Sequence, residues 1–356
     1  MDLLVREEYL KKAIVLHENV PVVDAHLDLA GEILLRSRLG EREIIRKHYL
    51  KNWQTAGIKL MVSSVYVPTG IILKGGSEAA WEDALRQIKV LLEDMEGMEE
   101  VMLVKNREDL KKAVSGEKTG ILIYMEGLDC IGEDLHRLEK LYDMGVRGAS
   151  LTWSRKNALA WGCCKASEKV QIKGGLTEKG REVIREMEAL SMFLDVSHLN
   201  DDGFEDVKAT AKKPFCATHS CARSIYDNYR NLTDSQMEYL AGQDGVMGLN
   251  GCKYIAGSLM GNHLEMLCRH AEYEMEKAGK EHVGFGFDLC DSYDQAAYML
   301  NRDDRKEEPE LCDCLIHHGQ IPLLTAALLQ GGMDEKTVEG IMGGNFIRFF
   351  NSTLPC

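Results

Sequence analysis

The stretch Val22-Val23-Asp24-Ala25-His26-Leu27-Asp28-Leu29-Ala30 begins as a short apolar strand and ends in the polar pattern Asp-x-His-x-Asp. Because side chains alternate between the two faces of a strand, we expect Asp24, His26 and Asp28 to point the same way. An imidazole and a carboxylate two residues apart on one face suit a divalent ion such as zinc. The alternative for this stretch alone is a core histidine beside a solvated aspartate.

Apolar runs of this kind recur along the chain and alternate with helical patterns. The runs cover residues 21–27, 58–67, 120–125, 146–153, 192–198, 214–219, 245–250 and 282–288. Eight strand-and-helix units predict parallel pairing and favour a closed (β/α)8 TIM-like barrel, which we expect to form a single domain over residues 1–356. The alternative is an open doubly wound sheet, but the chain contains no Gly-x-Gly-x-x-Gly loop to support it.

Several helices can be placed by their caps and their apolar spacing. Thr177, Asn200 or Asp201, and Thr233 are predicted N-caps, since their side-chain oxygens can accept from the first free backbone N–H groups. Leu85, Ile88, Leu92 and Met95 follow the spacing of one buried helical face. We also expect helices over residues 1–10, 321–329 and 335–350.

The composition excludes some classes of function. With 57 acidic and 43 basic residues the net charge is -14, and no basic stripe points to nucleic acid or an anionic membrane as a partner. No secretory signal is evident, and no stretch approaches the roughly 20 apolar residues of a membrane span.

The eleven cysteines lie mostly in apolar runs, as buried thiols do, which predicts a reducing, cytoplasmic location. Two cysteine groups lack the spacing of a zinc finger, and we interpret both as structural: Cys163-Cys164, and Cys312-x-Cys314 ahead of His317 and His318.

Metal-type residues follow the ends of several predicted strands, where barrel enzymes place their chemistry. The residues are His26, Asp28, Glu126, His198, His219 and Asp288. One catalytic zinc takes about three protein ligands. This larger set fits two ions that share a carboxylate, hold a hydroxide between them and polarise a carbonyl.

In these features the sequence resembles the membrane (renal-type) dipeptidases and their bacterial relatives, within the amidohydrolase superfamily of metal-dependent hydrolase barrels. The matching segments, in chain order, are Asp24-Ala25-His26-Leu27-Asp28, Glu126-Gly127, Leu151-Thr152-Trp153, Leu176-Thr177-x-x-Gly180-Arg181, Asp195-Val196-Ser197-His198, Ala217-Thr218-His219-Ser220, Arg230-Asn231-Leu232-Thr233-Asp234, His282-Val283-Gly284-x-Gly286-x-Asp288 and Gly343-Gly344-Asn345-Phe346-x-Arg348.

The resemblance implies a zinc-dependent dipeptidase with two Zn²⁺ per chain. It assigns His26 and Asp28 to the first ion, His198 and His219 to the second, and Glu126 to both, as a bridging residue of the catalytic centre. A dipeptide with a free C-terminal carboxylate is the implied substrate, and a homodimer is the implied assembly.

Three further residues receive roles from the same resemblance. Asp288 is similar to the family's proton acceptor and shuttle, and Arg230 to the residue that binds the substrate carboxylate. Trp153 stands where the animal members have a histidine close to the scissile carbonyl, so the resemblance implies that Trp153 contacts the substrate. Which group stabilises the oxyanion is left open. Two rival functions use the same barrel: an N-acyl amino acid deacylase or lactonase, and a non-catalytic barrel that binds metal or peptide.

Overall fold

The computed structural model describes residues 3–168, 170–301 and 308–356, and within them nine strands form one parallel sheet. The strands are β1 Val22–Leu27, β2 Ile58–Tyr66, β3 Val101–Leu103, β4 Thr119–Glu126, β5 Val146–Ser150, β6 Phe193–Asp195, β7 Ala217–Ser220, β8 Met247–Leu249 and β9 Val283–Phe285. Their order is β6-β5-β4-β2-β1-β9-β8-β7, and β3 pairs with the first residues of β4. The eight predicted strands are therefore confirmed, and the short β3 is an addition that the pattern missed.

The two terminal strands of this order, β6 and β7, meet through a single parallel bridge between Asp195 and Cys216. Cys216 N donates to Leu194 O at 3.0 Å, and Val196 N donates to Cys216 O at 2.9 Å. The sheet therefore curves round into a barrel whose last contact is a bridge rather than a full ladder. Its strand ends consequently face one common mouth.

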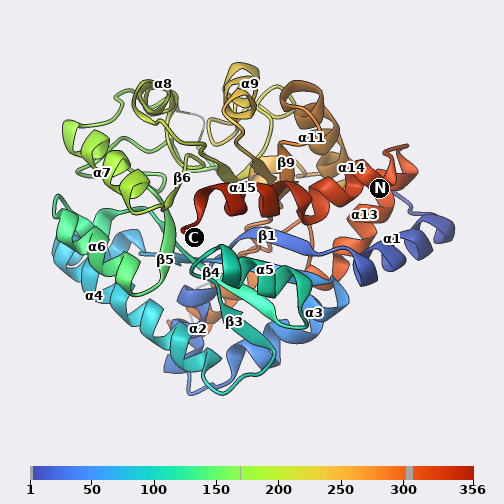
Figure 1. Cartoon of the computed structure of the whole chain (residues 1–356), viewed down its shortest axis with the longest axis horizontal. Helices are drawn as coiled ribbons and strands as arrows, with labels where there is room; N and C mark the ends of the chain where they lie inside the picture. Colours follow the sequence, from blue (N-terminus) through green and yellow to red (C-terminus); the bar gives the residue numbers. More distant parts are fainter. Residues whose placement is uncertain (1–2, 169, 302–307) are drawn as a thin grey trace.

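Helices surround the sheet (Figure 1). They are α1 Glu7–Asn19, α2 Leu29–Arg38, η1 Ile45–Tyr49, α3 Leu50–Thr55, α4 Thr69–Met95, α5 Arg107–Ser115, η2 Asp129–Ile131, α6 Leu135–Asp143, α7 Glu178–Ala189, α8 Asp201–Thr210, α9 Asp234–Gly242, α10 Lys253–Ala256, α11 His263–Ala278, α12 Asp291–Leu300, η3 His318–Gln320, α13 Ile321–Gln330, α14 Glu335–Glu339, η4 Gly340–Gly344 and α15 Asn345–Thr353. None of those described has the length and apolar character needed to cross a membrane.

The predicted N-caps are confirmed, with Asn200 rather than Asp201 in the cap position of α8. Thr177, Asn200 and Thr233 each accept a hydrogen bond from a backbone N–H in the first turn of their helix. Two predicted helices differ in detail. The first helix begins at Glu7 rather than at the amino end, and Met1 and Asp2 lie outside the described residues. The last is divided into α14 and α15 by the π-helical turn η4.

An aromatic column fills the barrel and connects the helix at its far end to the mouth. The Phe350 ring lies 5.2 Å from that of Phe193, and Phe193 stacks on Tyr124 at 5.8 Å. The Tyr124 ring is in turn 5.7 Å from that of His26. Phe350 belongs to α15, which crosses the centre of the view in Figure 1. Its contact with Phe193 shows that this helix packs against the barrel interior. The polar strand-end residues therefore lie at the opposite end of the barrel, at its mouth.

Candidate metal centre

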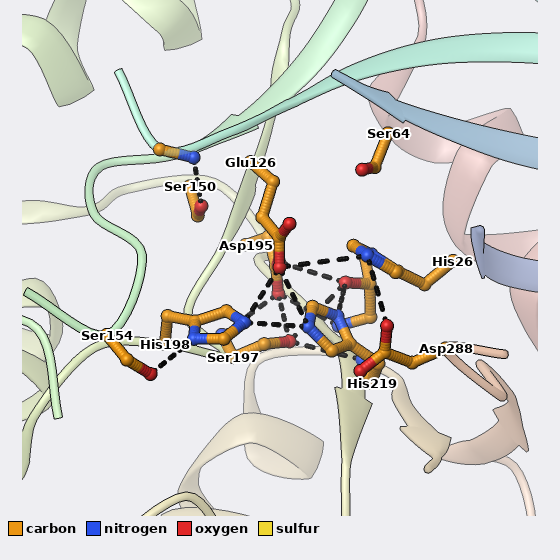
Figure 2. A network of polar contacts seen from close by, with 12 residues as sticks. His26, Ser64, Glu126, Ser150, Ser154, Asp195, Ser197, His198, His219 and Asp288 are labelled. Atoms are coloured by element: carbon orange, nitrogen blue, oxygen red, sulfur yellow. Dashed lines mark hydrogen bonds and ion pairs between the residues drawn. The ribbon is translucent and has the colours of Figure 1, made fainter. Parts of the chain in front are cut away.

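Three histidines converge on one carboxylate oxygen at the mouth of the barrel. Glu126, the last residue of β4, places its Oε1 2.8 Å from His198 Nε2, 3.3 Å from His219 Nε2 and 3.7 Å from His26 Nε2. His26 lies on β1 and His219 on β7, whereas His198 follows β6. Figure 2 shows these side chains pointing toward one another from separate strands. The structure thus brings together the strand-end residues that the sequence singled out.

Two aspartates complete this group. Asp28 Oδ1 lies 3.9 Å from His26 Nε2, and Asp288 Oδ1 lies 3.8 Å from the same nitrogen. Asp28 also accepts a hydrogen bond from Ser64. All six predicted strand-end residues therefore surround one small volume. Asp24 is different: its carboxylate accepts from the backbone N–H of Phe287 at 2.9 Å and lies 3.0 Å from His318 Nε2.

The histidines are held neutral, with lone pairs available for a cation. Burial, followed by the positive charge of Arg230, lowers the pKa of His26 to about 3 and holds the pKa of His198 well below its usual value. Burial does the same to the pKa of His219. Both ring nitrogens of His26 are buried without a hydrogen-bond partner in the described part of the chain. An orphaned, neutral imidazole of this kind fits a metal ligand.

Hydroxyl groups orient the other two rings. Thr218 Oγ1 donates to Asp195 Oδ2 at 2.9 Å, so at 2.7 Å it accepts from His219 Nδ1–H, which leaves Nε2 deprotonated. His198 Nδ1 lies 2.9 Å from Ser154 Oγ. Such outer contacts fix the tautomer of metal-binding histidines. Asp195 and Ser154 were not identified as site residues from the sequence, although Asp195 lies at a strand end and within one of the segments that match the family.

The carboxylates crowd together and repel. Burial and the charge of Asp288 raise the pKa of Asp28 to about 7, and burial with both aspartates raises the pKa of Glu126 well above its usual value. Burial raises the pKa of Asp288 to about 6, against the opposing charge of Arg230. Cations between these groups would relieve the repulsion. The donor set, three neutral imidazoles with the carboxylates of Asp28 and Glu126, therefore fits two divalent metal ions.

Asp288 is held in an uncommon backbone conformation. Its φ is 54°, in the left-handed region, which aspartate tolerates better than most residues. Its backbone N–H donates to His26 O at 3.2 Å, and its Oδ2 accepts from Asn250 Nδ2 at 3.2 Å. These contacts direct the carboxylate into the site, and this kind of local strain is common at functional positions.

A cavity of about 420 Å³ opens above the group and is lined by Asp28, Glu126, His198, Arg230 and Asp288, together with Tyr66, Trp153, Ser154, Lys165, Ala166, Ser167, Cys252, Tyr254, Ile255, Cys290, Tyr293, Asp294 and Cys312. Its size is that of a small-ligand pocket. Trp153, predicted to contact substrate, packs between Tyr66 and His198, with ring centroids 5.2 Å and 5.7 Å away.

Arg230 lies at the floor of this cavity, 2% exposed. Its Nη1 donates to Ser197 O and Ser220 Oγ, and its Nη2 donates to His219 O. Nη2 also lies 3.2 Å from His198 Nε2, and Nε has no partner among the described residues. Arg230 thus braces the strand ends, and two of its N–H groups are not committed to backbone or hydroxyl oxygens.

Comparisons with known proteins agree with this geometry. The sequence model of the membrane dipeptidase family, peptidase family M19, matches residues 10–354. Dipeptidase 3 of Rattus norvegicus is 26% identical over 351 residues, which is 96% of this chain and 66% of that protein. Dipeptidase tcpJ of Claviceps purpurea is 25% identical over 76% of this chain and 60% of its own length. The chain therefore spans slightly under two thirds of these curated relatives.

Solved structures share the fold. A metallopeptidase of Rhodobacter sphaeroides, liganded with a phosphinate mimic of the dipeptide L-Ala-D-Ala, superposes with a TM-score of 0.81 at 24% identity, over 94% of this chain and 99% of that one. The dipeptidase AC, a metallopeptidase of family M19, gives the same TM-score over 95% of this chain and 99% of its own. Because the family model spans nearly the whole chain, the protein belongs to the membrane dipeptidase family of metallopeptidases, peptidase family M19.

Proposed function

We propose that this chain is a zinc-dependent dipeptidase that hydrolyses dipeptides with a free C-terminal carboxylate. The observation that carries this proposal is the convergence of three histidine Nε2 atoms within 3.7 Å of one oxygen of Glu126. In this proposal the residues that would hold the ions are His26 and Asp28 for one, His198 and His219 for the other, and Glu126 for both. When bound, the two ions would lower the pKa of a water toward neutrality and polarise the scissile carbonyl.

The chain's own residues would supply proton transfer and orientation. Asp288 would take the proton of the attacking water and pass it to the leaving amine, a task for a carboxylate with a pKa near the working pH. Arg230 would bind the substrate's C-terminal carboxylate through Nε–H and the Nη2–H that faces His198. Trp153, which covers the His198 ring, would form an apolar wall of the cavity.

A substrate panel tests the proposal against its rivals. Zinc-loaded protein would be assayed with L,L and L,D dipeptides, with N-acyl amino acids and with lactones, and metal would be counted per chain. We expect at least two ions per chain and the fastest turnover for dipeptides. Faster turnover of acyl amino acids or lactones would favour the deacylase or lactonase, and bound metal without any turnover would favour a non-catalytic barrel.

Arg230→Lys tests the substrate's carboxylate contact and retains one positive charge. We expect KM to rise for dipeptides much more than for the same dipeptides with an amidated C-terminus, because lysine cannot reproduce the guanidinium fork. An equal change in KM for both substrate forms would place the contact elsewhere.

The thiols support a proposal about location. All eleven cysteines lie in the described part of the chain, and no disulfide joins any of them there. We propose a reducing compartment such as the cytoplasm, where thiols persist.

A further inference from the structure

A second group of metal-type side chains lies outside the pocket. Cys221 follows β7, and His270 and Glu274 lie four residues apart on one face of α11. All three residues are buried, and one ligand atom from each lies within 4.8 Å of the others. None of the three is among the described residues that line the cavity.

The Glu274 carboxylate is the unexplained feature of this group. The side chain is 0% exposed, and neither of its oxygens has a hydrogen-bond partner in the described residues. A buried carboxylate is costly unless it is paired or coordinates a metal. Its Oε1 lies 3.9 Å from His270 Nδ1, too far for a hydrogen bond and slightly wider than the roughly 3.3–3.6 Å that separates two ligands of one tetrahedral zinc.

The His270 ring is oriented as metal-binding histidines are. Its Nε2 lies 3.0 Å from the carbonyl oxygen of Ala256, which can only accept, so Nε2 carries the proton and Nδ1 carries the lone pair. Nδ1 faces the group and accepts one long hydrogen bond, 3.2 Å, from Ala222 N. An ion at Nδ1 would replace that contact.

We propose that Cys221, His270 and Glu274 form a third metal site, structural rather than catalytic, for zinc or a similar borderline-soft divalent ion. One thiolate, one imidazole and one carboxylate form a ligand set that zinc accepts. Complete burial matches the closed coordination of structural zinc sites.

Such an ion would stabilise the loop that serves the active centre. Cys221 is two residues beyond His219, and its backbone N–H donates to Asn231 Oδ1 at 3.2 Å. Asn231 in turn donates to Ile255 O at 2.8 Å and adjoins Arg230 in sequence. The site would therefore fix the segment between His219 and Arg230, so it goes beyond the proposed activity and can be tested apart from it.

Cobalt(II) reconstitution of the full chain provides the test, because a thiolate ligand gives cobalt a sulfur-to-metal charge-transfer band. No thiol belongs to the proposed binuclear centre, so the band reports on Cys221. We expect the band and about three metal ions per chain in the wild type, and about two ions with no band in Cys221→Ser. Cys290→Ser is the matched control, since it removes the thiol that contacts Asp288, and it should retain the band.

The proposal is overturned if fully loaded wild-type protein shows no thiolate band, or if the band persists in Cys221→Ser or disappears in Cys290→Ser. Should Cys221→Ser fail to fold, Glu274→Gln preserves side-chain volume and should bind one ion fewer than wild type; three ions in a folded Glu274→Gln would also contradict the proposal. Dipeptide turnover by protein with two ions would leave the proposed function intact.

Discussion

At the scale of single residues, Glu126 organises the centre. It ends β4, and its Oε1 is the point on which the three histidines converge. The sequence predicted this meeting because parallel strands of a barrel present their carboxyl ends at one mouth. It could not predict which oxygen faces which ring, since that depends on rotamers fixed by packing.

Replacing Asp288 by asparagine separates proton transfer from metal binding. Asparagine also tolerates the left-handed φ of 54°, so the backbone should be preserved. We expect metal content to be unchanged and kcat to fall by roughly 10²–10⁴-fold, the usual contribution of a general base. Asp244→Asn is the control, because Asp244 has a similar φ of 58° and lies outside the described cavity lining. Wild-type turnover in Asp288→Asn would refute the assigned role.

The contacts that orient the site were only partly predictable. The strand-end ligands follow from the apolar pattern, whereas the roles of Arg230 and Trp153 came from the family resemblance. The hydrogen bonds of Ser154 to His198, and of Thr218 to both Asp195 and His219, join residues distant in sequence or depend on ring tautomers. A single sequence carries no direct signal for such contacts.

At the scale of elements, strands and helix starts were predicted well because each has a local cause. The barrel strands are buried on both faces and therefore read as apolar runs. The side-chain oxygens of Thr177 and Thr233 accept hydrogen bonds from backbone N–H groups in the first turn of α7 and α9, respectively. The strand β3, Val101–Leu103, was missed because its apolar run ends at Val104, whereas the equally short β6, β8 and β9 lie within longer predicted runs, residues 192–198, 245–250 and 282–288.

The first turn of α8 is joined to the segment after β7 by a bidentate ion pair. Arg223 Nη1 and Nη2 donate to Asp201 Oδ2 and Oδ1 at 2.9 Å and 2.8 Å. Burial raises the pKa of Asp201, but the Arg223 contacts outweigh burial and hold the pKa below its usual value. Because the folded pKa is depressed, the stabilisation is present above the unfolded pKa of about 3.9 and disappears as pH falls through the folded pKa.

We therefore expect Asp201→Asn to lower the free energy of unfolding by about 1–2 kcal/mol at pH 7, and by progressively less as pH falls from 5 toward 2. A double-mutant cycle with Arg223→Gln, measured by chemical denaturation of metal-free protein, isolates the pair. A coupling energy that did not decline in acid would contradict the ion-pair interpretation.

At the scale of the whole molecule, α15 packs against the interior of the barrel and the polar centre occupies the mouth. The backbone at Gly286 lies very close to the backbone of β7, since a Cβ added at Gly286 would lie 1.7 Å from Thr218 O. Glycine at this position therefore lets β7 and β9 converge, which brings His219 and Asp288 to the same centre. Gly286 is visible in the sequence, but only the structure shows that a larger side chain there would collide with Thr218 O.

Removal of metal should lower the stability of the folded protein, because the neighbouring carboxylates of Asp28, Glu126 and Asp288 then lose the positive charge that offsets their repulsion. We expect chelation to lower the thermal midpoint and zinc to restore it. Each bound ion should raise the free energy of unfolding by about 2.7 kcal/mol at a free concentration one hundred times its dissociation constant. His198→Asn, which removes one ligand of the proposed binuclear centre, should respond less to added zinc. A midpoint indifferent to chelator and zinc would indicate that the centre binds no ion.

The most direct measurement of the central claim is an anomalous difference map from a crystal of the zinc-loaded protein, recorded at the zinc absorption edge. Two peaks about 3.5–4 Å apart are predicted, both within coordination distance of Glu126, one beside His26 and the other between His198 and His219. No peak at Glu126, or a single peak that leaves His26 or His198 without a metal neighbour, would contradict the account.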